Sequence, residues 1–386
     1  MLEILNFVFS VLVGLFLLVL LVVLHELGHA IAARRNGVVV EEFGNGFPPR
    51  AWARKLGNGV LFTLNWLPLG GYVKLQGEHD AADKPGDYGA ASLWVKTKIL
   101  LAGVFINWAT AALIFTGLAL VGLPKVIDNQ FTVASDTTEI RKPVTIVQTT
   151  DGSPAEKAGL EPGDQILRFA GQQLDEPSDL SALTEQFKGK TVEAIYKRGG
   201  QERSVDLTLR AENKDSKGYL GVSADQRTTY RSTWSAPIVG VALTGQVTQV
   251  TLSGLGDMLA KFGTGIVDKL TPSENAQEQG DKKLDQVSSG VAGPLAILGI
   301  LFPSAREAGI TSLLFMTALI SLALAIMNIL PIPALDGGRW FVTMLFRVLK
   351  KPLTKDLEEK IHGTGFMALM VLFVLVTIAD IGKFGN

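Results

Sequence analysis

Hydrophobic residues in this chain are gathered in long runs rather than spread evenly. Four runs, at residues 7–30, 99–123, 310–330 and about 365–381, are long and continuous enough to cross a membrane. A helix of about 20 apolar residues spans the hydrocarbon core of a bilayer. Hydrophobic residues make up 47% of the 386, and the mean hydropathy is +0.28. The pattern predicts a multi-pass α-helical membrane protein with about four transmembrane helices and polar insertions.

Lys and Arg are concentrated in two of the polar segments, residues 31–98 and 331–364. The positive-inside rule places both segments in the cytoplasm. Both termini and the long insert, residues 125–308, are then expected on the outside. The first run lacks a basic segment before it, so we interpret it as a retained helix rather than a cleaved signal peptide.

The segment 60–77, VLFTLNWLPLGGYVKLQG, is rich in residues that favour strands. The sequence Pro-Leu-Gly-Gly at 68–71 is typical of a hairpin turn, and it includes Gly70 and Gly71. We expect a membrane-embedded β-hairpin, because irregular backbone at membrane depth must be buried in protein or line a cavity. Such a hairpin could pair with an extended substrate peptide. A packed amphipathic loop without a substrate role is an equal alternative.

Residues 143–223 alternate strand-like runs with turns, which predicts a soluble α+β module. The run SPAEKAGLEPGDQI at 153–166 resembles the signature of bacterial PDZ domains, which bind peptides in a groove beside a strand. The loop of Gly218, Tyr219, Leu220 and Gly221 resembles the carboxylate-binding loop of these domains. The module could bind a peptide or act only as a steric gate, and both alternatives stay open.

The region after this module is less hydrophobic than the four runs. Residues 236–270 carry apolar positions at helical spacing, which favours interfacial helices over a fifth crossing. Residues 271–285 are polar and charged, and we expect a flexible loop. Residues 290–302 are apolar but short, which fits a re-entrant or interfacial segment.

The sequence His-Glu-Leu-Gly-His at 25–29 closes the first apolar run. On a helix, His25 and His29 share one face because four residues complete slightly more than one turn. Two imidazoles at this spacing can hold zinc, and Glu26 beside them can act as a general base. Ionisable groups next to a hydrocarbon layer are costly and usually functional.

A matching acidic residue, Asp336, follows the third run in the sequence NILPIPALDGG. The predicted topology brings Asp336 to the same cytoplasmic depth as His25 and His29. Two imidazoles and one carboxylate are a typical ligand set for catalytic zinc, with a water in the fourth position. The prolines end the preceding helix, and two glycines allow a close turn.

HELGH, the PDZ-like insert and NILPIPALDGG together resemble the site-2 protease family, and the closest similarity is to the bacterial branch of the regulator of sigma-E protease. The resemblance covers nearly the whole chain. It implies Zn²⁺ on His25, His29 and Asp336, with Glu26 as general base. It also implies substrate contacts by the hairpin around Gly70 and Gly71 and by two asparagines, Asn107 and Asn328. The sequence departs from the family pattern before the first asparagine, where it has Gly103-Val104 in place of Gly-Pro.

The family's known biology sets further expectations. They are a bacterial inner-membrane location, single-pass membrane substrates such as anti-sigma factors or remnant signal peptides, and prior trimming by a site-1-type protease. The expected parts are an N-terminal membrane half (1–124), an extracytoplasmic PDZ domain (125–225), an interfacial linker (226–308) and a C-terminal membrane half (309–386).

Composition narrows the alternatives. The chain has no cysteine, which excludes disulfides, thiolate ligands and a cysteine nucleophile. The net charge of −1 gives no overall field that favours nucleic acid, so the lipid bilayer and membrane proteins are the expected partners. The rival function is a non-catalytic membrane scaffold that binds peptides through its PDZ module. Glu26 argues against it, because a purely structural metal site does not need that residue.

Overall fold

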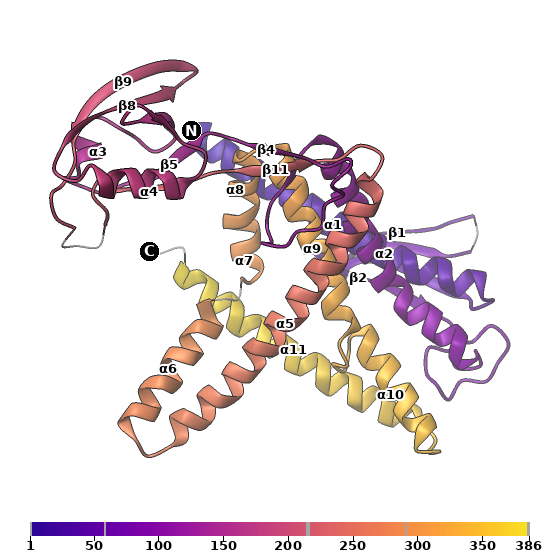
Figure 1. Ribbon diagram of the computed structural model, residues 1–386. Helices are drawn as coiled ribbons and strands as arrows, with labels where there is room; N and C mark the ends of the chain where they lie inside the picture. Colours follow the sequence, from indigo (N-terminus) through magenta and orange to yellow (C-terminus); the bar gives the residue numbers. More distant parts are fainter. Residues whose placement is uncertain (1, 58, 214–216, 290–291, 384–386) are drawn as a thin grey trace. The chain divides into compact units, whose positions relative to one another are not determined.

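The computed structural model describes residues 2–57, 59–213, 217–289 and 292–383 (Figure 1). The chain forms two compact units. Unit 1 joins Met1–Leu118 to Ala236–Asn386, and unit 2 is the insert Ala119–Ser235. Unit 1 is mainly helical, whereas unit 2 is built around β-sheets.

Unit 1 contains long apolar helices, as the hydrophobic runs predict. Among the described residues, five helices are long and apolar enough to cross a membrane, one more than expected. The additional helix is α5, which is continuous over 35 residues where we expected several interfacial pieces. Its most apolar stretch has a mean hydropathy of only 1.3, against 2.0 or more for the others. The five helices are α1 (Leu2–Arg35), α2 (Leu93–Val121), α5 (Ala236–Leu270), α9 (Ile310–Ile329) and α11 (Lys355–Lys383).

Shorter helices of unit 1 occupy three segments between the long ones. The predicted flexible loop at 271–285 is wrong, because Glu274–Ser289 forms the polar helix α6. The apolar segment expected at 290–302 begins outside the described residues and continues as α7 (Pro294–Ala296), the π-helix η1 (Ile297–Leu301) and α8 (Phe302–Glu307). The segment after α9 contains a further helix, α10 (Asp336–Val348).

Glycines set the closest helix contacts in unit 1. A methyl group at Gly28 of α1 would lie 2.8 Å from the carbonyl oxygen of Ala102 on α2. A methyl group at Gly14 would lie 2.6 Å from the ring of Phe302 on α8. Close backbone approach through small residues is the usual way in which helices associate in membranes, where hydrophobic burial between helices contributes little.

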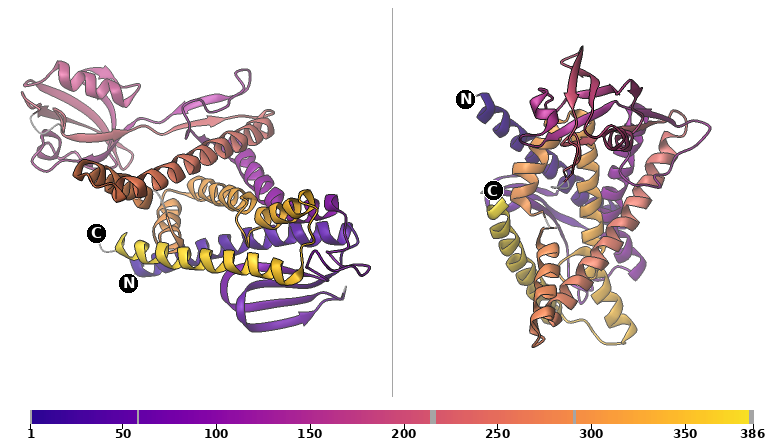
Figure 2. Two further views of the ribbon diagram at one scale, coloured as in Figure 1. Left: turned by 90° about the horizontal axis from the view of Figure 1, so that it is seen from below. Right: turned by 60° about the vertical axis from the view of Figure 1, so that its left-hand side comes forward.

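A β-sheet packs against the second half of α1 (Figure 2). It consists of β1 (Val40–Lys55) and β2 (Leu61–Leu75), which pair antiparallel. The predicted strand content of residues 60–77 is therefore confirmed, but the predicted pairing within that segment is wrong. Its two arms lie on either side of β1, so that Gly44 is opposite both Thr63 and Tyr72.

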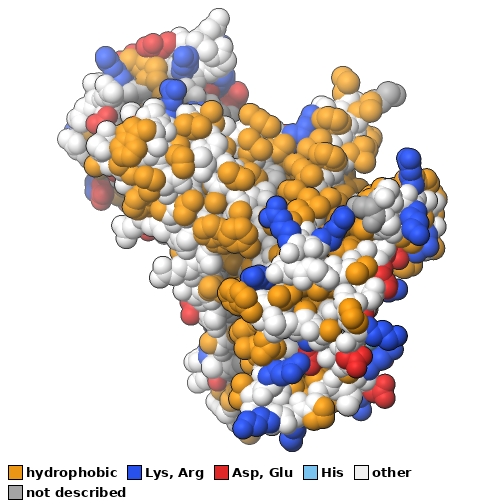
Figure 3. Space-filling model, turned by 90° about the vertical axis from the view of Figure 1, so that its right-hand side faces the viewer, with side chains coloured by type: hydrophobic (Ala, Val, Ile, Leu, Met, Phe, Trp, Pro, Cys, Tyr) orange, Lys and Arg blue, Asp and Glu red, His pale blue; other side chains and the backbone are white. Residues whose placement is uncertain are grey.

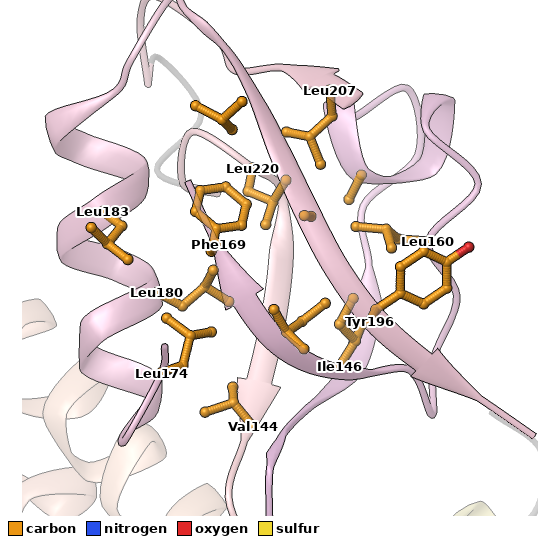
Figure 4. Packing of buried hydrophobic residues seen from close by; sticks show 14 of the residues in the cluster. Val144, Ile146, Leu160, Phe169, Leu174, Leu180, Leu183, Tyr196, Leu207 and Leu220 are labelled. Carbon is orange, nitrogen blue, oxygen red and sulfur yellow. The ribbon is translucent and has the colours of Figure 1, made fainter. Parts of the chain in front are cut away.

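Unit 2 contains the PDZ-like module. Its main sheet has the strand order β10-β5-β6-β8-β9, with β7 paired to β6, and a smaller sheet has the order β3-β11-β4. Buried hydrophobic side chains of the described residues form the core between the main sheet and its helices, and Figure 4 shows most of them. The elements are β3 (Leu123–Pro124), β4 (Thr138–Arg141), β5 (Val144–Thr149), α3 (Pro154–Lys157), β6 (Gln165–Phe169), β7 (Gln172–Gln173), α4 (Pro177–Gln186), β8 (Thr191–Arg198), β9 (Gln201–Thr208), β10 (Val222–Asp225) and β11 (Thr228–Arg231).

The motif at 153–166 has a local structural role at each end. Ser153 caps helix α3 by accepting a hydrogen bond from the Glu156 amide, and Pro154 occupies the first helical position. At the other end, Asp164 is buried and accepts hydrogen bonds from Arg198 and from the Glu161 amide. The motif therefore starts α3 and fixes the turn that leads into β6.

Hydrophobic side chains cover wide areas of the molecular surface (Figure 3). Phe105, Leu113 and Val121 of α2 are each at least 65% exposed, and so is Trp66 of β2. Water-soluble proteins rarely expose contiguous apolar patches of this kind, whereas lipid-facing helices do. The surface agrees with a protein that lies in a membrane.

Candidate metal centre

Three metal-ligating side chains meet in unit 1: His25, His29 and Asp336. The Nε2 atoms of His25 and His29 lie 3.0 and 3.2 Å from Oδ2 of Asp336. The two Nε2 atoms are 3.1 Å apart. Both rings are buried, and the carboxylate side chain is 19% exposed. Three donor atoms so close together are an arrangement that can hold a single cation.

The separations suit zinc. Around a tetrahedral zinc ion with bond lengths of ~2.0–2.1 Å, neighbouring ligand atoms lie about 3.3 Å apart. The three observed distances, 3.0 to 3.2 Å, are close to that value. Nitrogen and carboxylate oxygen are also ligands that zinc accepts readily. The residues present therefore fit the metal.

Asp336 reaches the histidines because the chain turns sharply between α9 and α10. Asp336 is the first residue of α10, where the sequence suggested a turn. A methyl group at Gly337 or Gly338 would lie about 2 Å from a backbone oxygen of the turn (2.1 and 1.9 Å). Glycine is therefore required at both positions, because the backbone of the turn leaves no room for a side chain. Ala334, two residues earlier, has a φ of +81°, a backbone conformation that residues other than glycine rarely adopt.

Helix α2 covers the other side of the two histidine rings. Nδ1 of His29 lies 2.7 Å from the carbonyl oxygen of Ile99. One turn further along α2, a methyl group at Gly103 would lie 2.4 Å from Nε2 of His29. Gly103 thus provides the space in which the rings lie. This role is not visible in the sequence, because the contact joins residues that are 74 positions apart.

Glu26 is half-buried next to the metal-ligating residues and faces the sheet. A methyl group at Gly71 of β2 would lie 3.0 Å from Cγ of Glu26 and equally close to Val22. Gly71 pairs with Asn45 of β1, and no described strand pairs with the other side of residues 71–75. Glu26 therefore follows His25 in α1 and lies against Gly71, on a strand segment with one unpaired edge among the described residues.

The remaining residues expected to contact substrate lie in different surroundings. Gly70 is covered by the ring of Phe47, 2.7 Å from where its methyl group would be. Asn328 is half-buried near the end of α9, and its side chain donates to the carbonyl oxygen of Leu324 in its own helix. Asn107 is fully buried, with Nδ2 3.3 Å from Nδ1 of His25.

In unit 2, the loop expected to bind a peptide carboxylate lines a cavity. Gly218, Tyr219, Leu220 and Gly221 form one wall, α4 forms another, and β10 lies along the edge. Gly221 has a φ of +77°, and the carbonyl of Leu220 accepts a hydrogen bond from the Ala155 amide. The loop is therefore held against α3, where the sequence motif begins.

Further side chains hold the metal-binding region together without contacting the three ligands. Arg339 of α10 donates to the carboxylate and to the backbone oxygen of Glu78. Nδ1 of His362 on α11 accepts a hydrogen bond from the amide of Ala334 at 3.2 Å. Neither contact is predicted by the sequence. The rarity of histidine, with four in the chain, was the available signal for His362.

Two imidazoles and a carboxylate around one point, with a second carboxylate beside them, are the parts of a metalloprotease active site. Helix α1, which is long enough to cross a membrane, carries the two histidines and Glu26, and Asp336 begins α10 shortly after α9, another helix of that length. The sequence model of peptidase family M50 matches residues 13–372 of this chain. The chain belongs to this family, the site-2 proteases, and is a membrane zinc metalloprotease. The family resemblance, the enzyme class and the zinc cofactor are thereby confirmed.

Individual relatives are similar in sequence to this chain over nearly its whole length. The chain is 30% identical over 363 residues to a candidate zinc metalloprotease of Clostridium perfringens, covering 94% of this chain and 95% of the relative. It is 25% identical over 446 residues to the zinc metalloprotease RasP of Geobacillus kaustophilus, covering 94% and 96%. It is 24% identical over 445 residues to the regulator of sigma-W protease RasP of Bacillus subtilis, again covering 94% and 96%.

Solved structures match a smaller part of this chain. The PDZ domain of an SdrC-like protein from Listeria monocytogenes is 24% identical, covers 24% of this chain and 93% of that domain, and has a TM-score of 0.20. The corresponding domain from Listeria innocua is 26% identical, covers 22% and 93%, and has a TM-score of 0.19.

Proposed function

We propose that this protein is an intramembrane endopeptidase that cleaves single-span membrane proteins within or near their transmembrane helix. The observation that carries the proposal is the position of His25, His29, Asp336 and Glu26 on or beside apolar helices, next to the open edge of β2. A substrate helix protects its peptide bonds, because each carbonyl is bonded internally and water is absent. The enzyme must unwind the helix and bring water to it.

The proposed roles follow from the chemistry of each residue. His25, His29 and Asp336 hold zinc, which supplies Lewis acidity that polarises the scissile carbonyl and makes water nucleophilic near neutral pH. Glu26 takes the proton of the attacking water and delivers it to the leaving amine. The two carboxylates thus have different tasks, one as ligand and the other as base.

We further propose that the edge of β2 at residues 71–75 holds the unwound substrate as an added strand, with Gly70 and Gly71 at the start of the contact. An open strand edge offers backbone hydrogen bonds to an extended peptide of any sequence. Asn328, half-buried near the end of α9, is the proposed polar contact for the substrate backbone. Both elements of this substrate site lie in unit 1.

The cellular setting is part of the proposal. We place the protein in a bacterial inner membrane, with the metal centre near the cytoplasmic side and with the PDZ domain and both termini outside. The substrates are anti-sigma factors or remnant signal peptides already shortened by a site-1-type protease. The name of the Bacillus subtilis relative, a regulator of sigma-W protease, supports this class of substrate.

The test uses a panel of single-span proteins in detergent or vesicles, with outer segments of full and shortened length. The wild-type enzyme should cleave shortened members in or near the span, and Glu26→Gln should lose ~10²- to 10⁴-fold in rate, the usual contribution of general-base catalysis. Cleavage confined to soluble loops, at equal rates for both lengths, would contradict the proposal.

For the PDZ-like module we propose that the cavity beside α4 binds the carboxyl terminus of a peptide. Ser181 is exposed on α4 and lines this cavity, so Ser181→Arg should block it and weaken peptide binding. Ser204→Arg, at an exposed position of β9 outside the cavity lining, is the matched control. Titration of fluorescent peptides with free or amidated ends measures the effect. If Ser181→Arg binds as tightly as the control, the cavity is not a peptide site.

A further inference from the structure

Helix α2 presents three successive turns to the two histidine rings. Ile99 contributes its carbonyl oxygen to Nδ1 of His29, and Asn107 contributes its side-chain amide to Nδ1 of His25. Gly103 lies midway between them and leaves room for the rings. The positions 99, 103 and 107 are four residues apart, so they share one face of the helix. Each ring therefore has one nitrogen at the metal centre and the other against α2.

The direction of the rings fixes which nitrogen carries hydrogen. Nε2 of His25 faces Asp336 and Nε2 of His29, as a metal-binding nitrogen must. A neutral imidazole that binds metal through Nε2 keeps its hydrogen on Nδ1, and that hydrogen needs an acceptor. For His29 the acceptor is the carbonyl oxygen of Ile99. For His25 the neighbouring group is the side-chain amide of Asn107.

The side-chain amide of Asn107 presents a donor, and not an acceptor, to Nδ1 of His25. Its NH₂ group faces Nδ1 of His25, which would bring two donors together. Its Oδ1 atom is buried, with no hydrogen-bond partner in the part of the chain that the structure describes. The oxygen and nitrogen of an amide are assigned from their hydrogen bonds, and a half-turn exchanges them. That exchange gives Oδ1 a donor and the Nδ1 hydrogen of His25 an acceptor.

We propose that Oδ1 of Asn107 accepts the Nδ1 hydrogen of His25 and so holds the Nε2 atom of His25 toward the metal. Asn107 is then a positioning residue for a zinc ligand and not a substrate contact. This inference rests on the proposed zinc-binding role of His25. It is supported by the fixed place of Asn107, which is fully buried and whose backbone oxygen accepts a 2.8 Å hydrogen bond from Ser321 on α9.

The experiment measures the zinc dissociation constant of the purified full chain by competition with a chelator. Asn107→Leu keeps the approximate size of the side chain but removes the acceptor, and it should weaken zinc binding by ~10- to 100-fold, as loss of such partners usually does. Asn107→Asp keeps the acceptor and should bind zinc at least as tightly as the wild type. Asn328→Leu is the matched control and should leave zinc affinity unchanged.

A second measurement separates positioning from substrate contact. With excess zinc, Asn107→Leu should regain most of its cleavage rate, whereas a residue that binds substrate would leave a defect that zinc does not relieve. Thermal unfolding of each variant in excess chelator reveals any folding defect. If Asn107→Asp unfolds at a lower temperature than the wild type in excess chelator, its zinc affinity is set aside. The difference in zinc affinity between Asn107→Leu and Asn328→Leu is then the test.

The inference is overturned if Asn107→Leu binds zinc like the control, or if a folded Asn107→Asp binds it as weakly as Asn107→Leu. Absence of zinc binding in the wild type would instead refute the zinc site itself. The two failures are therefore distinguishable.

Discussion

Gly103 is the residue on which the packing of the metal centre depends most directly. Its α-carbon faces both histidine rings, and the methyl group of an alanine would lie 2.4 Å from Nε2 of His29 and 2.7 Å from Cε1 of His25. Neither ring can retreat freely, because α2 also holds their Nδ1 atoms. The Val104 that follows, in place of the family's proline, does not remove this space.

We therefore expect Gly103→Ala to displace the histidines and to lower zinc affinity by at least about tenfold, with a parallel loss of cleavage. The control is Gly117→Ala on the same helix, where no described residue beyond the adjacent helical backbone comes within 4 Å of the added methyl group. Alanine there should be neutral or stabilising by roughly 0.5–1 kcal/mol, because glycine is costly inside a helix. Zinc titration and cleavage rates check both variants. Equal behaviour of the two would show that the rings tolerate the methyl group.

At the scale of elements, the turn between α9 and α10 determines where Asp336 lies. Its strained residue, Ala334, is held by a hydrogen bond from its amide to Nδ1 of His362 on α11. Helix α11 also contacts the turn where Gly365 approaches Pro333. The first half of α11 therefore supports the turn that leads to Asp336.

Variants of His362 distinguish the contribution of this hydrogen bond from that of the other contacts of α11. His362→Leu removes the acceptor and should reduce cleavage about fivefold, which corresponds to a net hydrogen bond of ~1 kcal/mol. His362→Asn places an oxygen near the position of Nδ1 and should retain activity. His79→Leu, which removes a histidine paired at 3.4 Å with exposed Glu359, is the control and should have little effect. If His362→Asn is as impaired as His362→Leu, the hydrogen bond is not what matters.

The elements that the sequence predicts well are those with a local signal. The apolar runs of α1, α2, α9 and α11 are visible residue by residue, and so is the spacing of His25 and His29. Ser153 and Pro154 likewise mark the start of α3 by local rules. In such elements, the residues that determine the structure are neighbours in the chain.

The elements that were missed depend on distant partners. Strand β1 contains Glu41, Glu42 and a Pro-Pro pair, which hide any regular alternation, and its strand form depends on pairing with β2. Helix α6 is strongly polar and packs on α5, where Gly280 lies against the backbone of Gly265. Gly337 and Gly338 are poor helix formers, yet they lie in the first turn of α10 because a larger residue would clash with the preceding backbone.

At the scale of the whole molecule, the proposed orientation makes a direct prediction. The chain has no cysteine, so a single introduced thiol reports one position without background. Cysteines at Lys84 and Lys355 should be shielded from an impermeant thiol reagent in intact cells, whereas one at Lys188 should react. Permeabilised cells are the control, in which all three should react. Labelling of the Lys84 position from outside would reverse the orientation.

The two carboxylates of the proposed active site have different roles, one as a zinc ligand and the other as a general base. Asp336 lies in the triangle with His25 and His29, whereas Glu26 lies beside it and faces β2. Their removal should therefore have different consequences for metal content, even though both variants should be inactive.

The most direct measurement is zinc stoichiometry together with cleavage rate for the wild type, Glu26→Gln and Asp336→Ala. We expect Glu26→Gln to retain one zinc per chain while its rate falls by ~10²-fold or more. Asp336→Ala should lose both zinc affinity and activity, because it removes a ligand. A Glu26→Gln protein that still cleaves at nearly the wild-type rate, or an Asp336→Ala protein with full zinc and full activity, would contradict the account.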